Sequence, residues 1–167
     1  VPRRTLDVTG AIPDEHGRVV IPDHVMYDGE RYTVQILGDY ALERAGISDI
    51  SLPATLEVVG QFALFGNRFK TIVFPESVGS ILRGALHSCR QLESIELGSH
   101  VNVIDLNAFT DCPRLRRITI RTAQPPVLGA QGIERENITL YVPAEAVEAY
   151  RHTDGWSEFH NIVPCPF

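Results

Sequence analysis

The chain has 167 residues, of which 44% are hydrophobic and 22% are charged, and its formal net charge is −6. This length fits one domain with a packed core, and the acidic balance argues against a general nucleic-acid-binding protein. No apolar run approaches the roughly 18 residues that a membrane helix needs. The 3 scattered cysteines are too few for a disulfide scaffold.

Residues 1–46 predict an N-terminal cap followed by a partial repeat. Apolar and polar residues alternate over 25–34, on both sides of the pair Asp28-Gly29. Such a pair between alternating runs predicts a β-hairpin, because glycine adopts positive φ without strain. The partial repeat, over 37–42, carries the residue types that recur in the full repeats after it.

Residues 47–136 consist of four repeats, which start 22, 23 and 23 residues apart, at Ile47, Phe69, Leu92 and Leu115. The fourth and sixth positions are always large and apolar: Ile50, Ile72, Ile95 and Ile118, then Leu52, Phe74, Leu97 and Ile120. This alternation predicts a short strand with one buried face. One repeat buries too little apolar surface to fold alone, so we expect the repeats to stack into a solenoid of parallel strands.

Residues 137–167 predict a further partial repeat and a C-terminal cap. The strand pattern returns at 140–143, and 144–151 has high helix propensity after Pro143, a suitable first helical residue. Three apolar side chains are expected to form a lid over the last coil: Val147, Tyr150 and Trp156. We therefore predict a single repeat domain over 1–167 with a cap at each end.

The repeat pattern L-x-x-I-x-L-P-x-x-L-x-x-I-G-x-x-A-F-x-x-C resembles the BspA-like, or Treponema pallidum-type, leucine-rich repeat over 32–121. The segments 19–42 and 138–164 resemble the beginning and the ending of such proteins from Bacteroidetes. Some positions depart from the pattern: Gly98 and Arg121 replace the proline, Leu82 and Asp105 replace the glycine, and Asn67 replaces the cysteine.

The resemblance implies a mainly β leucine-rich-repeat solenoid with an N-terminal β-hairpin cap and a C-terminal helical cap. It also implies a secreted or surface-attached bacterial protein that binds rather than catalyses, since some members are adhesins for host matrix proteins. The chain starts at Val1 and not at Met, so we expect any export signal or anchor to lie outside it.

No catalytic or nucleotide-binding motif is present, and none of the six histidines forms a ligand-like i, i+4 pair. We therefore expect no enzymatic activity, no metal site and no cofactor. Cys89 and Cys112 occupy the same position in adjacent repeats, where strands about 4.8 Å apart allow a disulfide. The alternative is a column of buried free thiols, which the cysteine of the resembled repeat favours.

The strand positions between the buried anchors are expected to form the concave surface that leucine-rich repeats commonly use for binding. The candidate ligand-binding residues there are Lys70, Glu93, Glu96, Arg114, Arg116, Arg117 and Arg121. The four arginines, with Arg90 one coil earlier, form a basic cluster. They either contact an anion, such as a sulfated glycan or an acidic protein patch, or form salt bridges with Glu93 and Glu96.

These observations predict a non-enzymatic, monomeric binding module, extracellular or on the outer cell surface. It would engage a protein or a glycan, such as a host matrix component, through the concave strand face, and would bind no nucleic acid. The alternative is a structural spacer or assembly domain that packs against another bacterial protein.

Overall fold

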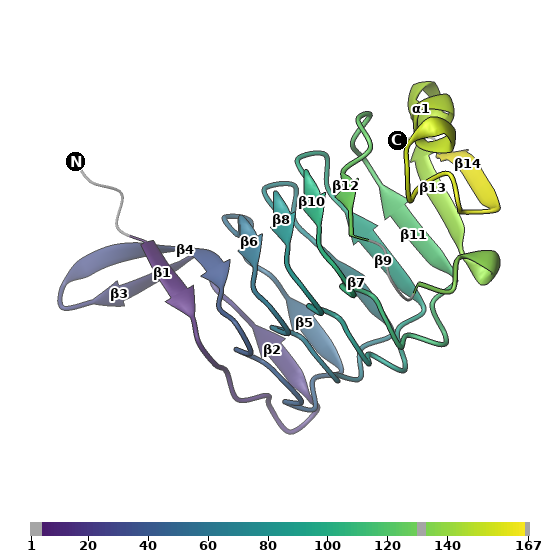
Figure 1. Cartoon of the computed structure of the whole chain (residues 1–167). Helices are drawn as coiled ribbons and strands as arrows, with labels where there is room; N and C mark the ends of the chain where they lie inside the picture. Colours follow the sequence, from purple (N-terminus) through teal and green to yellow (C-terminus); the bar gives the residue numbers. More distant parts are fainter. Residues whose placement is uncertain (1–4, 130–132, 166–167) are drawn as a thin grey trace.

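The computed structural model describes residues 5–129 and 133–165. The chain winds into a solenoid of parallel strands of about 6 turns, with a single short helix at its C-terminal end (Figure 1). The strands of successive turns pair into a seven-stranded, a five-stranded and a two-stranded sheet, which confirms the predicted leucine-rich-repeat solenoid.

The first sheet contains the strands that begin the repeats and is called the ladder here. Its five strands pair in parallel in the order β14-β13-β11-β9-β7. Their bounds are Thr71–Val73 for β7, Ser94–Leu97 for β9, Arg117–Ile120 for β11, Thr139–Pro143 for β13 and Asn161–Cys165 for β14. The preceding strands, β2 (Arg18–Val20) and β5 (Asp49–Ser51), form a separate two-stranded sheet.

The register of the ladder places one buried apolar side chain of every strand in a single row. The row consists of Ile72, Ile95, Ile118, Leu140 and Ile162. Because side chains alternate along a strand, the residues on either side of this row face outward. The predicted alternation is therefore confirmed in β7, β9, β11 and β13, whereas Ile50 and Leu52 are only partly buried.

The second sheet has seven strands and includes the predicted N-terminal hairpin. Its strands are β1 (Thr5–Val8), β3 (His24–Tyr27), β4 (Glu30–Leu37), β6 (Val58–Val59), β8 (Ser80–Ile81), β10 (Val103–Ile104) and β12 (Val127–Leu128). Strands β3 and β4 pair antiparallel around Asp28 and Gly29, whose φ angles are 49° and 73°. Two positive φ angles match the twist of a two-residue hairpin, which explains the Asp-Gly pair.

A compact turn follows each inner strand of the second sheet and stacks on the turn of the next coil. Backbone N–H groups donate from coil to coil, as from Leu42 to the carbonyl of Ala63 at 2.8 Å and from Leu64 to that of Ala85 at 2.9 Å. The recurring alanines are buried, so successive coils approach closely, as predicted. Positive φ recurs at one position of this turn, in Tyr40, Phe62, Gly84 and Asn107.

Aromatic rings stack on the exterior of these turns, which the sequence did not lead us to expect. The rings of Tyr40 and Phe62 lie 5.4 Å apart and nearly parallel, and those of Phe65 and His87 lie 5.3 Å apart. Bulky residues rarely adopt positive φ, so the stack holds Tyr40 and Phe62 in a strained backbone conformation.

The cysteine position of the repeat forms a hydrogen-bonded column, in which Asn67 and Cys89 are buried and Cys112 is partly buried. Each member donates to a main-chain carbonyl of the preceding coil: Asn67 Nδ2 to Leu42 at 2.8 Å, Cys89 Sγ to Leu64 at 3.3 Å, and Cys112 Sγ to Leu86 at 3.3 Å. Both cysteines are free thiols, and burial raises the pKa of each to about 12. The two cysteines thus form the predicted column of free thiols and no disulfide joins them. In the preceding coil, the amide of Asn67 takes the place of the thiol as the hydrogen-bond donor.

The C-terminal cap closes the last coil with a short helix and three buried aromatic residues, Tyr150, Trp156 and Phe159, whereas Val147 of the predicted lid is only partly buried. The 3-10 turn η1 (Arg135–Asn137) precedes β13, and η2 (Ala144–Ala146) leads into helix α1 (Val147–His152). The predicted helix thus begins as a 3-10 turn and is shorter as an α-helix than expected. The Tyr150 hydroxyl donates to the Thr122 carbonyl at 3.0 Å, and Trp156 Nε1 donates to that of Pro126 at 2.7 Å.

Candidate functional site on the exposed face of the ladder

The outward face of the ladder displays two rows of side chains at positions fixed by strand pairing. The first row is Thr71, Ser94, Arg117, Thr139 and Asn161, and the second is Val73, Glu96, Thr119, Tyr141 and Val163. At the start of the strands, the backbone N–H of Glu93 donates to the main-chain carbonyl of Lys70 at 2.7 Å. The backbone N–H of Arg116 donates in the same way to the main-chain carbonyl of Glu93 at 3.0 Å. Arg114 lies three residues before the first residue of β11 and Arg121 directly follows the strand, so all seven predicted residues lie on or beside the ladder.

Arg121 is neutralised by two carboxylates from earlier coils. Its guanidinium pairs with Glu96 and also with Glu76, at 3.3 Å from Nη1 to Oε1. The backbone N–H and the hydroxyl of Ser99 donate to Glu76 at 2.6 and 2.7 Å. These two hydrogen bonds, with the charge of Arg121, lower the pKa of Glu76 below its ordinary value. The salt-bridge alternative therefore holds for Arg121.

Arg90, the member of the basic cluster one coil earlier, is also paired. Its Nη2 lies 3.3 Å from Oδ2 of Asp111, to which the hydroxyl of Ser88 also donates at 2.7 Å. The Ser88 hydrogen bond, together with Arg90, lowers the pKa of Asp111. Arg90 therefore pairs with Asp111, and not with Glu93 or Glu96, the two partners that the sequence suggested.

The remaining three arginines are held by neutral groups. Arg114 Nη1 donates to the Gln91 side chain at 2.5 Å, and Arg116 Nη1 lies 2.9 Å from the carbonyl oxygens of both Pro113 and Leu115. The Arg117 guanidinium lies over the ring of Tyr141, 4.9 Å from its centroid. Within residues 5–129 and 133–165, none of these three arginines forms an ion pair.

These three arginines line one shallow depression, together with Glu93 and Ser94. Its volume is about 460 Å³, and we call it the arginine depression. Lys70 is exposed at the start of β7 and lies outside it. The structure thus divides the predicted cluster into two engaged arginines and three arginines that share one site. The sequence did not indicate Tyr141, although aligning 140–143 with the preceding strands places it in the second row.

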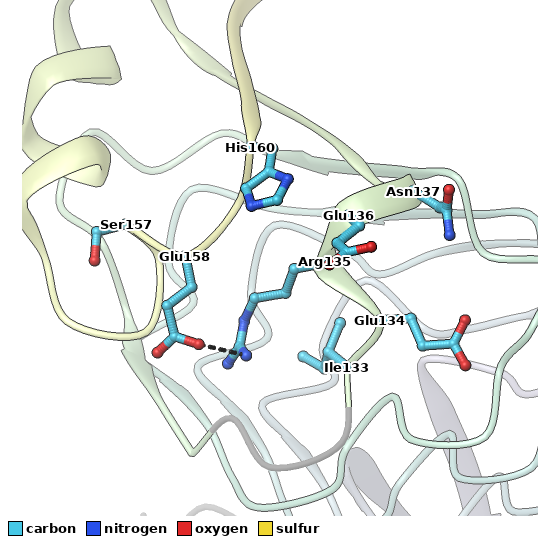
Figure 2. Close-up of a pocket in the computed structure, with 8 residues that line it drawn as sticks. All are labelled: Ile133, Glu134, Arg135, Glu136, Asn137, Ser157, Glu158 and His160. Carbon is cyan, nitrogen blue, oxygen red and sulfur yellow. Dashed lines mark ion pairs between the residues drawn. The ribbon is translucent and has the colours of Figure 1, made fainter.

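A second hollow, of about 600 Å³, lies at the C-terminal end between η1 and the segment that leads into β14 (Figure 2). Its central cation, Arg135, is paired with Glu158 at 2.7 Å and lies over the ring of Phe159. Figure 2 shows this pair in the middle of the hollow, with His160 above it. Arg135 thereby ties η1 to the cap, so we assign the pair to the stability of the cap.

Among the described residues, no group of three or more His, Cys, Asp or Glu side chains is arranged to hold a metal ion. The same part of the chain contains no helix long and apolar enough to cross a membrane.

Comparisons with known proteins place the chain among leucine-rich repeat proteins. A leucine-rich repeat protein from Bacteroides capillosus has a TM-score of 0.58 and 23% identity over 70% of this chain and 86% of its own. A leucine rich cell surface protein from Faecalibacterium prausnitzii has a TM-score of 0.53 and 17% identity over 86% of this chain and 48% of its own. At these identities the two structures show the fold alone. The comparison with curated proteins finds no match.

The family model described as "BspA type Leucine rich repeat region (6 copies)" matches residues 31–125, which is more than half of the chain. The matched segment contains β5 to β11 and therefore three of the five strands of the ladder, β7, β9 and β11. The chain belongs to the BspA-type leucine-rich repeat family.

Proposed function

We propose that this protein is a non-enzymatic binding module that engages a protein partner through the exposed face of the ladder. The observation that carries the proposal is the array of outward side chains on β7 to β14, whose spacing is fixed by backbone pairing. A preformed array loses little conformational entropy on binding, so recognition needs only complementary shape and charge. No covalent step is required.

An extracellular or outer-surface location completes the proposal. It is supported by the family and by the printed name of the Faecalibacterium prausnitzii protein, a cell surface protein of the same fold. The partner we propose is an extracellular protein, for example a host matrix component, and a glycan partner is the principal alternative outcome of the experiment below.

A second candidate function, that of a spacer or assembly domain, is favoured by the N-terminal hairpin. Strand β3 lies at the edge of the second sheet, and Met26 and Tyr27 are 67% and 71% exposed on it. An edge strand with exposed apolar side chains is suited to pairing with another chain. This function would use the hairpin instead of the ladder, so the two functions predict different sensitive residues.

The test is a binding screen against immobilised matrix proteins, mucins, and sulfated and neutral glycans. The ladder variant is Arg116→Glu/Arg117→Glu, and the matched control is Arg44→Glu/Arg83→Glu, which makes the same charge change at exposed sites off both the ladder and the hairpin. Circular dichroism verifies that both variants are folded. We expect saturable binding to a protein that only the ladder variant loses.

Other outcomes contradict the proposal in different ways. Binding retained by the ladder variant but lost on Met26→Ser/Tyr27→Ser would favour the assembly function. Binding to glycans alone would replace the protein partner with a glycan. A concentration-dependent shift to dimers in sedimentation would contradict the proposed monomer.

A further inference from the structure

We propose that the arginine depression is a carboxylate-binding site that receives an acidic stretch of the partner polypeptide. This inference rests on the proposed function and specifies the chemistry that the ladder recognises. It concerns Arg114, Arg116 and Arg117, which a single depression brings together at the start of β11.

The charge of the site is the first argument. The depression contains three guanidinium groups and one carboxylate, that of Glu93, in a protein whose formal net charge is −6. Arg121 and Arg90 have carboxylate partners, whereas these three arginines have none among the described residues. A locally positive site on an acidic protein attracts anionic groups, which the rest of the surface repels.

The arrangement of the guanidinium groups is the second argument. Each is held by neutral groups: Arg114 by a side-chain amide, Arg116 by two main-chain carbonyls through a single nitrogen, and Arg117 by the face of an aromatic ring. A guanidinium has five N–H donors, so these contacts orient it without using up its hydrogen-bonding capacity. Planar carboxylates bind such a fork in a bidentate manner, and little side-chain freedom remains to be lost.

The neighbours of the arginines favour a peptide over a sulfated glycan. Glu93 and Ser94 line the depression and present oxygen atoms that accept hydrogen bonds from peptide N–H groups. Glu96 lies on β9 two residues after Ser94, and it shares its pairing with Arg121 with a second carboxylate, that of Glu76. A polymer with a sulfate on every unit would approach these carboxylates, whereas a peptide alternates acidic side chains with donors and neutral groups.

The test measures fluorescence anisotropy of a labelled Glu-Gly-Glu-Gly-Glu peptide titrated with the purified chain. The glutamine version of the peptide and heparin are run beside it. The site variant is Arg116→Gln/Arg117→Gln. The controls are Arg83→Gln and Arg44→Gln, which remove a guanidinium at exposed positions off the ladder. Thermal unfolding verifies that every variant is folded.

We expect the acidic peptide to bind and the glutamine peptide to bind at least about tenfold more weakly, because charge-assisted hydrogen bonds are lost. The site variant should lose at least about tenfold in affinity, and Arg83→Gln and Arg44→Gln should change it by no more than about threefold. Arg117→Lys keeps the positive charge but loses the bidentate geometry of the guanidinium and its stacking on the Tyr141 ring. The affinity of this variant for the acidic peptide should therefore lie between those of the wild type and the site variant. Binding should also weaken between about 50 and 300 mM salt.

The inference is overturned if the acidic peptide fails to bind below about 1 mM, or if the site variant binds it as well as the wild type does. Heparin binding that is tighter than peptide binding and is lost in the site variant would assign the site to a sulfated glycan instead. If the screen identifies a protein partner that the ladder variant loses while the peptide does not bind, the proposed function stands and only the carboxylate site is refuted.

Discussion

Replacing Gly84 with alanine tests how the repeat turns pack. Gly84 has a φ of +63°, and a Cβ atom there would lie 2.4 Å from Cε1 and 2.6 Å from Cδ1 of Phe62. The ring of Phe62 cannot easily move away, because it stacks on Tyr40 and makes edge contacts with Phe65 and His87. The added methyl group would therefore cause both backbone strain and a steric clash with the Phe62 ring.

The magnitude follows from adding these penalties. A left-handed backbone costs a non-glycine residue about 1–2 kcal/mol, and inserting a methyl group into a packed contact costs about 1–3 kcal/mol. The loss of conformational freedom in the unfolded chain offsets about 0.4–1 kcal/mol. We expect Gly84→Ala to lower the free energy of unfolding by about 2–4 kcal/mol, which lowers Tm by about 4–16 °C for a chain of this size.

Two other glycines provide matched controls that separate the penalties. Gly46 has a φ of +77° with nothing within 4 Å of its Cβ position, so Gly46→Ala measures backbone strain alone. Gly79 lies outside the left-handed region and its Cβ would have ordinary contacts at 3.8–3.9 Å, so Gly79→Ala should change stability by less than about 0.5 kcal/mol. Urea denaturation followed by circular dichroism gives all three values.

A double-mutant cycle isolates the contact with the ring. In a Phe62→Ala background, Gly84→Ala should cost no more than Gly46→Ala does, which corresponds to a coupling of about 1 kcal/mol or more. The reasoning is wrong if Gly84→Ala is no more destabilising than Gly46→Ala, or if the cost at Gly84 is unchanged after the ring is removed.

Three further predictions concern buried or paired polar groups. Asn67→Leu removes an amide that donates to two carbonyls and accepts from the backbone N–H of Ile47. It should lower the free energy of unfolding by about 3 kcal/mol or more, whereas Asn67→Cys, which restores a donor, should lower it less in the same urea assay. Folding lowers the pKa of Glu76, so the ionised carboxylate stabilises the protein at pH values above its ordinary pKa of 4.5. This stabilisation is lost as the pH falls through the lower pKa of the folded state. Glu76→Gln should therefore make the loss of stability between pH 5 and pH 3 shallower, by a small amount since the side chain is half exposed, and an unchanged slope would contradict this. Because burial raises the pKa of the Cys89 and Cys112 thiols to about 12, both should react with a thiol reagent at pH 8 at least tenfold more slowly in the native than in the urea-unfolded protein, measured by mass spectrometry of the labelled peptides.

Sequence periodicity was sufficient to predict the coil, because the same residue types recur at the same position of every repeat. The isoleucines at Ile72, Ile95 and Ile118 align in one buried row, and Asp28-Gly29 forms the turn of the hairpin. Both features depend on local alternation or on a single backbone conformation, which residue identity specifies directly. The division into caps and repeats at 46/47 and 136/137 stays a prediction.

The candidate site could be placed on the ladder from the sequence, but the sequence did not show which of its charges are free. Arg121 pairs with Glu76, which is 45 residues away in sequence, and this pair distinguishes it from Arg116 and Arg117. Arg117 has its aromatic support from Tyr141, one coil later.

The sequence by itself determined that the chain forms a solenoid, that a recurring apolar position of the repeat is buried, and which face of the strands is displayed outward. Only the tertiary structure decided that three arginines share one depression and that Gly84 leaves room for the ring of Phe62. The physical reason is that burial follows a short repeating pattern, whereas the pairing of long side chains depends on the distances between their tips across coils. Those distances are set by the register and pitch of the assembled solenoid and by the competing contacts of each side chain.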